Sequence, residues 1–236
     1  MKSKPKKKTI YITKEELETP KKASEIRLWV GNKIKEISST AEGRQAIKFG
    51  EERCKELKEE ALPLGIFCKK YFHSDEVIIT HNVGSQNYDA TIEDHREIRQ
   101  ELKHLEITQA HEGENAHLRM LKLEEDGYVN LLGTVTSQGT KHTNRIIKIE
   151  NEAIEHSVIF DQEVQRIRDA AERKSGKECP SNTGLIIIVE DYIVFREKAE
   201  LNNLSQIISD DILPMLENFS KVFIVGWSSK VYLEFK

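Results

Sequence analysis

The segment YDATIEDHREIRQELKHLEIT, residues 88–108, decides the predicted fold. Polar and apolar residues alternate at both of its ends, which is typical of half-buried strands. Asp89 and Thr91 share one face of the first predicted strand, and Glu106 and Thr108 share one face of the second. Two neighbouring strands would bring Asp89 and Glu106 to one polar edge. Because adjacent carboxylates repel each other unless a proton or cation lies between them, this pair predicts a Mg²⁺ site.

The composition is that of an ordinary folded protein. The chain has 236 residues, of which 38% are hydrophobic and 32% charged, and its net charge is −4. This length suits one large domain or one domain with appendages. No apolar run is long enough to span a bilayer, and no apolar segment follows the Lys-rich start. We therefore expect a cytoplasmic protein that does not enter membranes, with its three cysteines, Cys54, Cys68 and Cys179, reduced.

The charge balance is unlike that of a dedicated non-specific DNA-binding protein, which is usually basic overall. One dense basic run exists, formed by Lys2, Lys4, Lys6, Lys7 and Lys8. Such a run can contact phosphates, but a solvated tail is the favoured interpretation. We assign residues 1–18 to this basic tail and residues 19–236 to a single domain.

The N-terminal part of that domain, residues 19–62, is predicted to be helical. Thr19-Pro20 resembles a helix start, with a capping hydroxyl before a proline at the first helical position. Apolar residues then recur at helical spacing as far as Ile37. A second helix is expected over residues 42–61, ended by Pro63 and Gly65.

The remaining chain alternates strands and helices. The sequence predicts three meandering strands, a helix over 114–125, a hairpin insertion within 128–150 and a helix over 153–174. Leu185–Val189 is apolar throughout, as in a parallel strand covered on both faces. A helix over 201–219 and strands over 222–225 and 231–235 complete the chain. The pattern favours an α/β fold with one mixed central sheet flanked by helices.

This order of elements, with Asp89 and Glu106 at their positions, resembles the PD-(D/E)XK superfamily of restriction-endonuclease-like nucleases. The resemblance covers roughly residues 43–195, with Asp89 at the family's Asp position and Glu106 at its Glu-x-Lys position. The segment Gly50-Glu51-Glu52 resembles the first helix of resolvase-type members, where a Glu helps to bind metal. The resemblance therefore implies metal ligation by Asp89, Glu106 and Glu51.

The function implied by the resemblance is metal-dependent phosphodiester hydrolysis, with DNA as the expected substrate and Mg²⁺ or Mn²⁺ as the cofactor. Nucleases of this fold often act as homodimers in defence, repair or mobile-element contexts. Here Thr108 occupies the family's lysine position, and threonine can offer only a neutral hydrogen bond. Asp89, Glu106, Thr108 and Gln109 are the candidate catalytic residues. The alternative is a catalytically inactive relative that binds nucleic acid or acts as a scaffold.

Other residues near Glu106 offer weaker candidates for the missing lysine. These are Lys103, which lies on the predicted apolar face, His111 and Lys141. His104, His111 and His117 lack the spacing of a zinc motif. The polar loop 136–145 is equally compatible with contact to a phosphate backbone and with a solvated hairpin tip.

Overall fold

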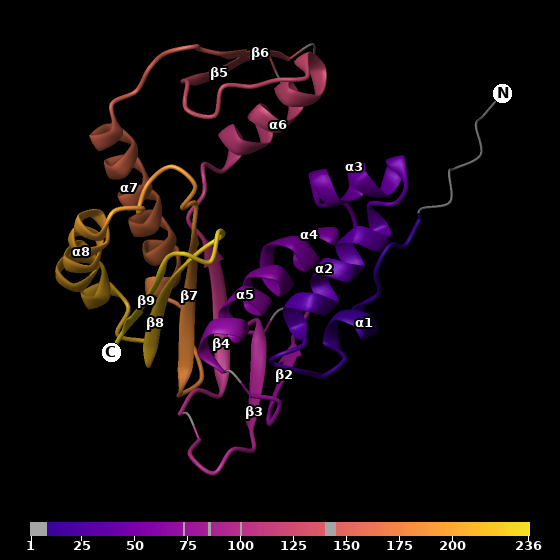
Figure 1. Ribbon diagram of the computed structural model, residues 1–236, viewed down its shortest axis with the longest axis vertical. Coiled ribbons are helices and arrows are strands. Elements are labelled where there is room, and N and C mark those ends of the chain that lie inside the picture. Colours follow the sequence, from indigo (N-terminus) through magenta and orange to yellow (C-terminus); the bar gives the residue numbers. More distant parts are fainter. Residues whose placement is uncertain (1–8, 73, 85, 100, 140–144) are drawn as a thin grey trace. The chain divides into compact units, whose positions relative to one another are not determined.

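The structure is a computed structural model that describes residues 9–72, 74–84, 86–99, 101–139 and 145–236. The chain divides into two units, Met1–Glu106 and Ile107–Lys236, and each contains both helices and strands (Figure 1). The α/β class expected from the sequence is therefore confirmed. The run from Lys2 to Lys8, and Lys141, lie outside the described residues. None of the helices in the described ranges has the length and apolar character needed to cross a membrane.

The first unit is a small antiparallel sheet with helices. Its strands follow the order β1-β2-β3-β4, each antiparallel to the next. The elements are α1 (Lys14–Glu18), β1 (Lys21–Lys22), α2 (Ile26–Ile37), α3 (Ala41–Phe49), α4 (Cys54–Glu56), the π-helix η1 (Leu57–Ala61), α5 (Leu62–Tyr71), β2 (Val77–His81), β3 (Ala90–Asp94) and β4 (His104–Gln109), whose last three residues belong to the second unit.

Alternating burial gives this sheet an apolar inner face. Along β2, Val77, Ile79 and His81 are buried, while the two residues between them are half-buried. In the pairing of β2 with β3, Ile79 lies opposite Ile92 and His81 opposite Ala90. The buried side chains at every second residue of β2, with those opposite them on β3, therefore form one continuous covered layer.

The helical N-terminal part differs from its prediction in three places. Residues 14–18, assigned to the tail, form α1, which is capped reciprocally by Thr13 and Glu16. Thr19-Pro20 does not start a helix, because Lys21–Lys22 pair with β2. The predicted helix over 42–61 is interrupted at Gly50, whose φ of 65° ends α3 in a left-handed conformation.

Pro63 also has a different role from the predicted one. It lies inside a continuous helical run from Cys54 to Tyr71, just after the π turn of η1. Gly65 is inside this helix, and a Cβ there would lie 2.8 Å from the Cα of Arg27. A close approach of α5 to the chain of α2, rather than a helix end, therefore explains this glycine.

The second unit contains the chain from the end of β4 onward. Its helices α7 and α8 lie beside the strands β7 and β8 (Figure 1). The elements are α6 (Glu114–Asp126), β5 (Val135–Gln138), β6 (Ile146–Ile149), α7 (His156–Ser175), β7 (Thr183–Val189), α8 (Lys198–Ile207), the π-helix η2 (Ile208–Ile212), the 3₁₀-helix η3 (Leu213–Met215), β8 (Lys221–Gly226) and β9 (Tyr232–Phe235).

The pairing in the second unit is mixed. Every residue of β7 is buried, and β7 runs parallel to β8, as the apolar run 185–189 predicts. Strand β9 is antiparallel to β8, and β5 and β6 form the expected hairpin. The helix over 114–125 is confirmed as α6, which ends at Gly127 with a φ of 77°.

Candidate functional site

Asp89 lies immediately before β3, beside β4. Its N–H donates to the carbonyl of Leu105 over 2.8 Å, and the next residue, Ala90, is the register partner of the same Leu105. Two residues on one strand facing one residue on the other is the pairing of a β-bulge, which interrupts strict alternation and re-aims a side chain. Asp89 is thus half-buried beside the residue that precedes Glu106.

Glu106 is more deeply covered than a half-buried strand predicts. Only 1% of its surface is exposed, and its neighbours Leu105 and Ile107 are buried as well. The half-buried strand that the alternation predicts is therefore wrong here, because four successive residues of β4, Leu105 to Thr108, are buried. Burial matters chemically, because charge interactions are stronger where water is excluded. The strand pairing does support one part of the expectation: the backbones at Asp89 and Glu106 lie next to each other.

Glu51 lies on no helix, in contrast to its prediction. It is exposed in the turn between α3 and α4. The carboxylate that reaches the strands from this region is Glu60 on η1, whose Oε2 lies 2.9 Å from Nε2 of the buried His81. The continuous helix expected over 42–61 does not predict this contact, because the break at Gly50 and the wider π turn both change the direction of the side chains that follow.

The candidates near the family's lysine position lie in different settings. Thr108 is buried, with 8% of its surface exposed. Gln109 is half-buried, and its carbonyl accepts a hydrogen bond from Arg173 over 3.0 Å. Lys103, expected on the apolar face, is exposed instead. Nδ1 of His111 accepts from the backbone N–H of Gly113 over 2.7 Å. Across the described ranges, no three His, Cys, Asp or Glu side chains are placed to hold one metal ion.

A cavity of about 280 Å³ forms a second candidate site within the second unit. Its walls come from α6, from the N-terminal half of α7, and from the loops 129–132 and 190–194. Most lining side chains are apolar, among them Met120, Leu131 and Ile159. The charged lining residues are Glu112, Arg119, Glu163, Arg166 and Glu190. This combination of apolar walls and a few converging polar groups is typical of small-molecule sites.

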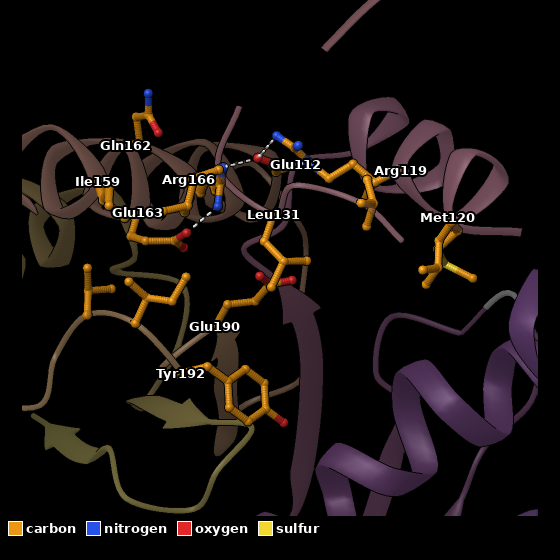
Figure 2. Close-up of a pocket in the computed structure, with 16 residues that line it drawn as sticks. Glu112, Arg119, Met120, Leu131, Ile159, Gln162, Glu163, Arg166, Glu190 and Tyr192 are labelled. Atoms are coloured by element: carbon orange, nitrogen blue, oxygen red, sulfur yellow. Dashed lines mark hydrogen bonds and ion pairs between the residues drawn. The ribbon is translucent and has the colours of Figure 1, made fainter. Parts of the chain in front are cut away.

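A row of ion pairs crosses this cavity. Glu112 accepts from Nε of Arg119 over 2.8 Å and from Nη2 of Arg166 over 2.6 Å. Arg166 also donates to Oε1 of Glu163. Figure 2 shows Arg119, Glu112 and Arg166 in one row, with the carboxylates of Glu163 and Glu190 turned toward the region below that row. Two helices, α6 and α7, and the loop before α6 therefore meet through charges rather than through apolar contact.

Arg119 fixes the loop that follows α6. Its Nη1 donates to the carbonyl of Asn130 over 2.7 Å, and its Nη2 donates to the carbonyl of Gly133 over 2.8 Å. With Glu112 as its third partner, this guanidinium is engaged on all sides of its planar fork. Arg119 thereby joins the wall formed by Leu131 and Leu132 to the helical wall.

Glu163 is the unusual member of the cavity. Only 5% of its surface is exposed, and burial raises the pKa of its carboxyl group to about 7, against the opposing effect of Arg166. Burial is also the largest cause that raises the pKa of Glu190. Oε2 of Glu163 has no hydrogen-bond partner among the described residues.

Sequence reasoning missed these residues although one signal was present. Glu163 lies four residues after Ile159 and four before Ile167, so it occupies the inward stripe of α7. A glutamate in an apolar stripe is rarely left unpaired, and it marks a buried site.

Comparison of the chain with protein-family models, with curated proteins and with solved structures found no match.

Proposed function

We propose that this protein is a Mg²⁺- or Mn²⁺-dependent nuclease of restriction-endonuclease-like fold, with DNA as its substrate. The observation that carries the proposal is the hydrogen bond from the N–H of Asp89 to the carbonyl of Leu105, directly before Glu106. It supports the view that the backbones at Asp89 and Glu106 lie side by side in the first unit. A β-bulge at such a place is a common feature next to active sites.

The order of elements along the chain also supports this proposal. Helix α5 is followed by the antiparallel strands β2, β3 and β4, and later by α7 and β7. This is the helix, three strands, helix and strand order that the resemblance implies. Asp89 lies directly before the second strand of that order, and Glu106 lies inside the third.

The donor set fits a hard divalent cation. Mg²⁺ prefers one or two carboxylates and completes its shell with water and phosphate oxygens, so Asp89 and Glu106 suffice as protein ligands. When bound, the cation would polarise the scissile phosphate and lower the pKa of a water molecule. The low exposure of Glu106 would strengthen its hold on a cation, since the competing solvent is excluded.

A cleavage assay with matched variants tests this function. Wild type, Asp89→Asn, Glu106→Gln and Glu93→Gln would be compared on single- and double-stranded DNA, with and without Mg²⁺ or Mn²⁺. Glu93 is the control because it is an exposed acid on β3. We expect metal-dependent cleavage that falls by about 100-fold or more in the first two variants, since each removes a charged metal ligand.

Cleavage that persists equally in Asp89→Asn and Glu106→Gln, or that ignores chelation of the metal, would contradict the proposal. Wild-type activity in Glu93→Gln shows that a lost acid on β3 is not in itself harmful. Light scattering of the purified protein tests the accompanying proposal of a homodimer, which suits cleavage of both strands.

A second candidate function is a nucleic-acid-binding module without catalysis. Thr108, which is buried, stands at the position where the family has lysine. Because its side chain offers no positive charge, it favours this second function. Fluorescence anisotropy with labelled DNA distinguishes the two functions. Binding without cleavage in any tested metal would support the module, whereas cleavage would exclude it.

A further inference from the structure

The cavity of the second unit contains an acceptor that its own surroundings leave unsatisfied. Oε1 of Glu163 accepts from Arg166, whereas Oε2 has no hydrogen-bond partner in the described part of the chain. The residue is 95% buried and lines the cavity. A buried polar atom without a partner costs free energy, which a ligand with a hydrogen-bond donor at this place would recover.

The charges around Glu163 select the kind of donor. Glu112, Glu163 and Glu190 face two guanidinium groups, those of Arg119 and Arg166, so one carboxylate is in excess. Arg166 already binds Oε1 of Glu163, so Oε2 is the atom left for a ligand. With one carboxylate in excess, this wall favours a hydrogen-bond donor over an acceptor or an anionic group. An amino or amide N–H group supplies such a donor.

The apolar walls select the shape of the ligand. The volume of about 280 Å³ lies near the lower end of the range for small-molecule sites, roughly 300–1,000 Å³. At the rim, Tyr192 is 58% exposed and Leu131 is 65% exposed, so both side chains offer apolar surface to a ligand. A planar ring can stack on the Tyr192 phenol while its edge reaches Glu163.

We propose that this pocket binds a nucleobase that carries an exocyclic amino group, with the amino group donating to Oε2 of Glu163 and the ring stacked on Tyr192. The amino-donor and planar-ring chemistry follows from the cavity, whereas the choice of a nucleobase among such rings rests on the proposed nuclease function. The base would come either from a free nucleoside or nucleotide or from an unstacked position in a polynucleotide, where bases are read in this way.

Titration of the protein with adenosine and with purine riboside, which lacks only the amino group, tests the donor. Calorimetry should give saturable binding of adenosine and at least about tenfold weaker binding of purine riboside, because the analogue leaves Oε2 unpaired. Binding should also weaken from about pH 8 to about pH 5.5, as Glu163 takes up a proton and loses its charge. Equal affinity for the two nucleosides, or no saturable binding of adenosine, would overturn the proposal.

Four variants locate the binding. Glu163→Gln should weaken adenosine binding about tenfold, and Tyr192→Ala should weaken it at least about fivefold, because base stacking is lost. Glu172→Gln, an exposed acid on the same helix, should bind as wild type does. Asp89 lies in the first unit, so Asp89→Asn should also bind adenosine as wild type does. The binding test therefore remains valid even if the nuclease proposal fails.

Unchanged affinity in both Glu163→Gln and Tyr192→Ala would overturn the proposal even if adenosine binds elsewhere. Since Tyr192 is exposed, its truncation keeps the fold, and its result stands if Glu163→Gln proves unstable. Competition by single-stranded oligodeoxyadenylate would support the pocket and assign the base to a polynucleotide. Adenosine binding without such competition would support it and assign the base to a free nucleoside.

Discussion

Glu163 shows how one buried carboxyl group couples stability to pH. Burial is the main cause that raises its pKa from 4.5 to about 7, and repulsion by Glu190 and Glu112 adds to it, against the opposing effect of Arg166. The folded protein therefore binds this proton more tightly than the unfolded chain does. The stability that follows is fully present below about pH 4.5 and is lost as the pH rises through about 7.

Glu163→Gln should reduce this pH dependence, since glutamine mimics the protonated form at every pH. The difference amounts to about 3 kcal/mol at most between about pH 4.5 and pH 8, and loss of the ion pair with Arg166 offsets part of it. Urea unfolding at several pH values measures it. A variant whose free energy of unfolding falls with pH as steeply as that of wild type, or of Glu172→Gln, would show that Glu163 is not the titrating group.

At the scale of elements, Gly133 is important for the packing of the loop between α6 and β5. A Cβ at this position would lie 1.7 Å from the carbonyl oxygen of Glu150, and the Gly133 carbonyl accepts a hydrogen bond from Arg119. Gly133→Ala should therefore lower the free energy of unfolding by about 1–3 kcal/mol, because the backbone must move. It should also weaken ligand binding in the cavity, whose wall this loop forms.

Gly31→Ala is the matched control. Gly31 is exposed inside α2, and nothing lies within 4 Å of a Cβ placed there. Alanine should stabilise this helix by about 0.5–1 kcal/mol, since it loses less backbone freedom on folding. Thermal unfolding of the two variants against wild type measures both effects. Stabilisation by Gly133→Ala would contradict the close approach to Glu150.

The elements that the sequence predicted well are those with unambiguous local patterns. The apolar run 185–189 identifies β7, and the period of apolar residues before Gly127 identifies α6. Errors occurred where tertiary structure overrides a local signal. Thr19-Pro20 has the chemistry of a helix start, yet the next two residues pair with β2. Pro63 has the chemistry of a helix end, yet the helical run continues through it from η1 into α5.

At the scale of the whole molecule, the two candidate sites differ in how far the sequence reveals them. Asp89 and Glu106 lie in adjacent strands of a short meander, so local alternation suffices to suggest their pairing. The cavity joins Glu112, Glu163 and Glu190, which belong to separate elements more than 25 residues apart. No local pattern states that such residues meet, and only Glu163, inside an apolar stripe, indicates its own burial.

Metal binding at Asp89 and Glu106 should be detectable in the stability of the whole protein, independently of catalysis. A ligand that binds only the folded state raises the free energy of unfolding by RT ln(1 + [L]/Kd), about 1.4 kcal/mol at a concentration ten times Kd. Removal of Mg²⁺ by a chelator should lower the unfolding temperature of wild type and of Glu93→Gln by the same amount. It should leave Asp89→Asn and Glu106→Gln unchanged, because each lacks one of the two proposed ligands. A metal-dependent shift of equal size in all four proteins, measured by calorimetry, would mean that the cation binds at another place.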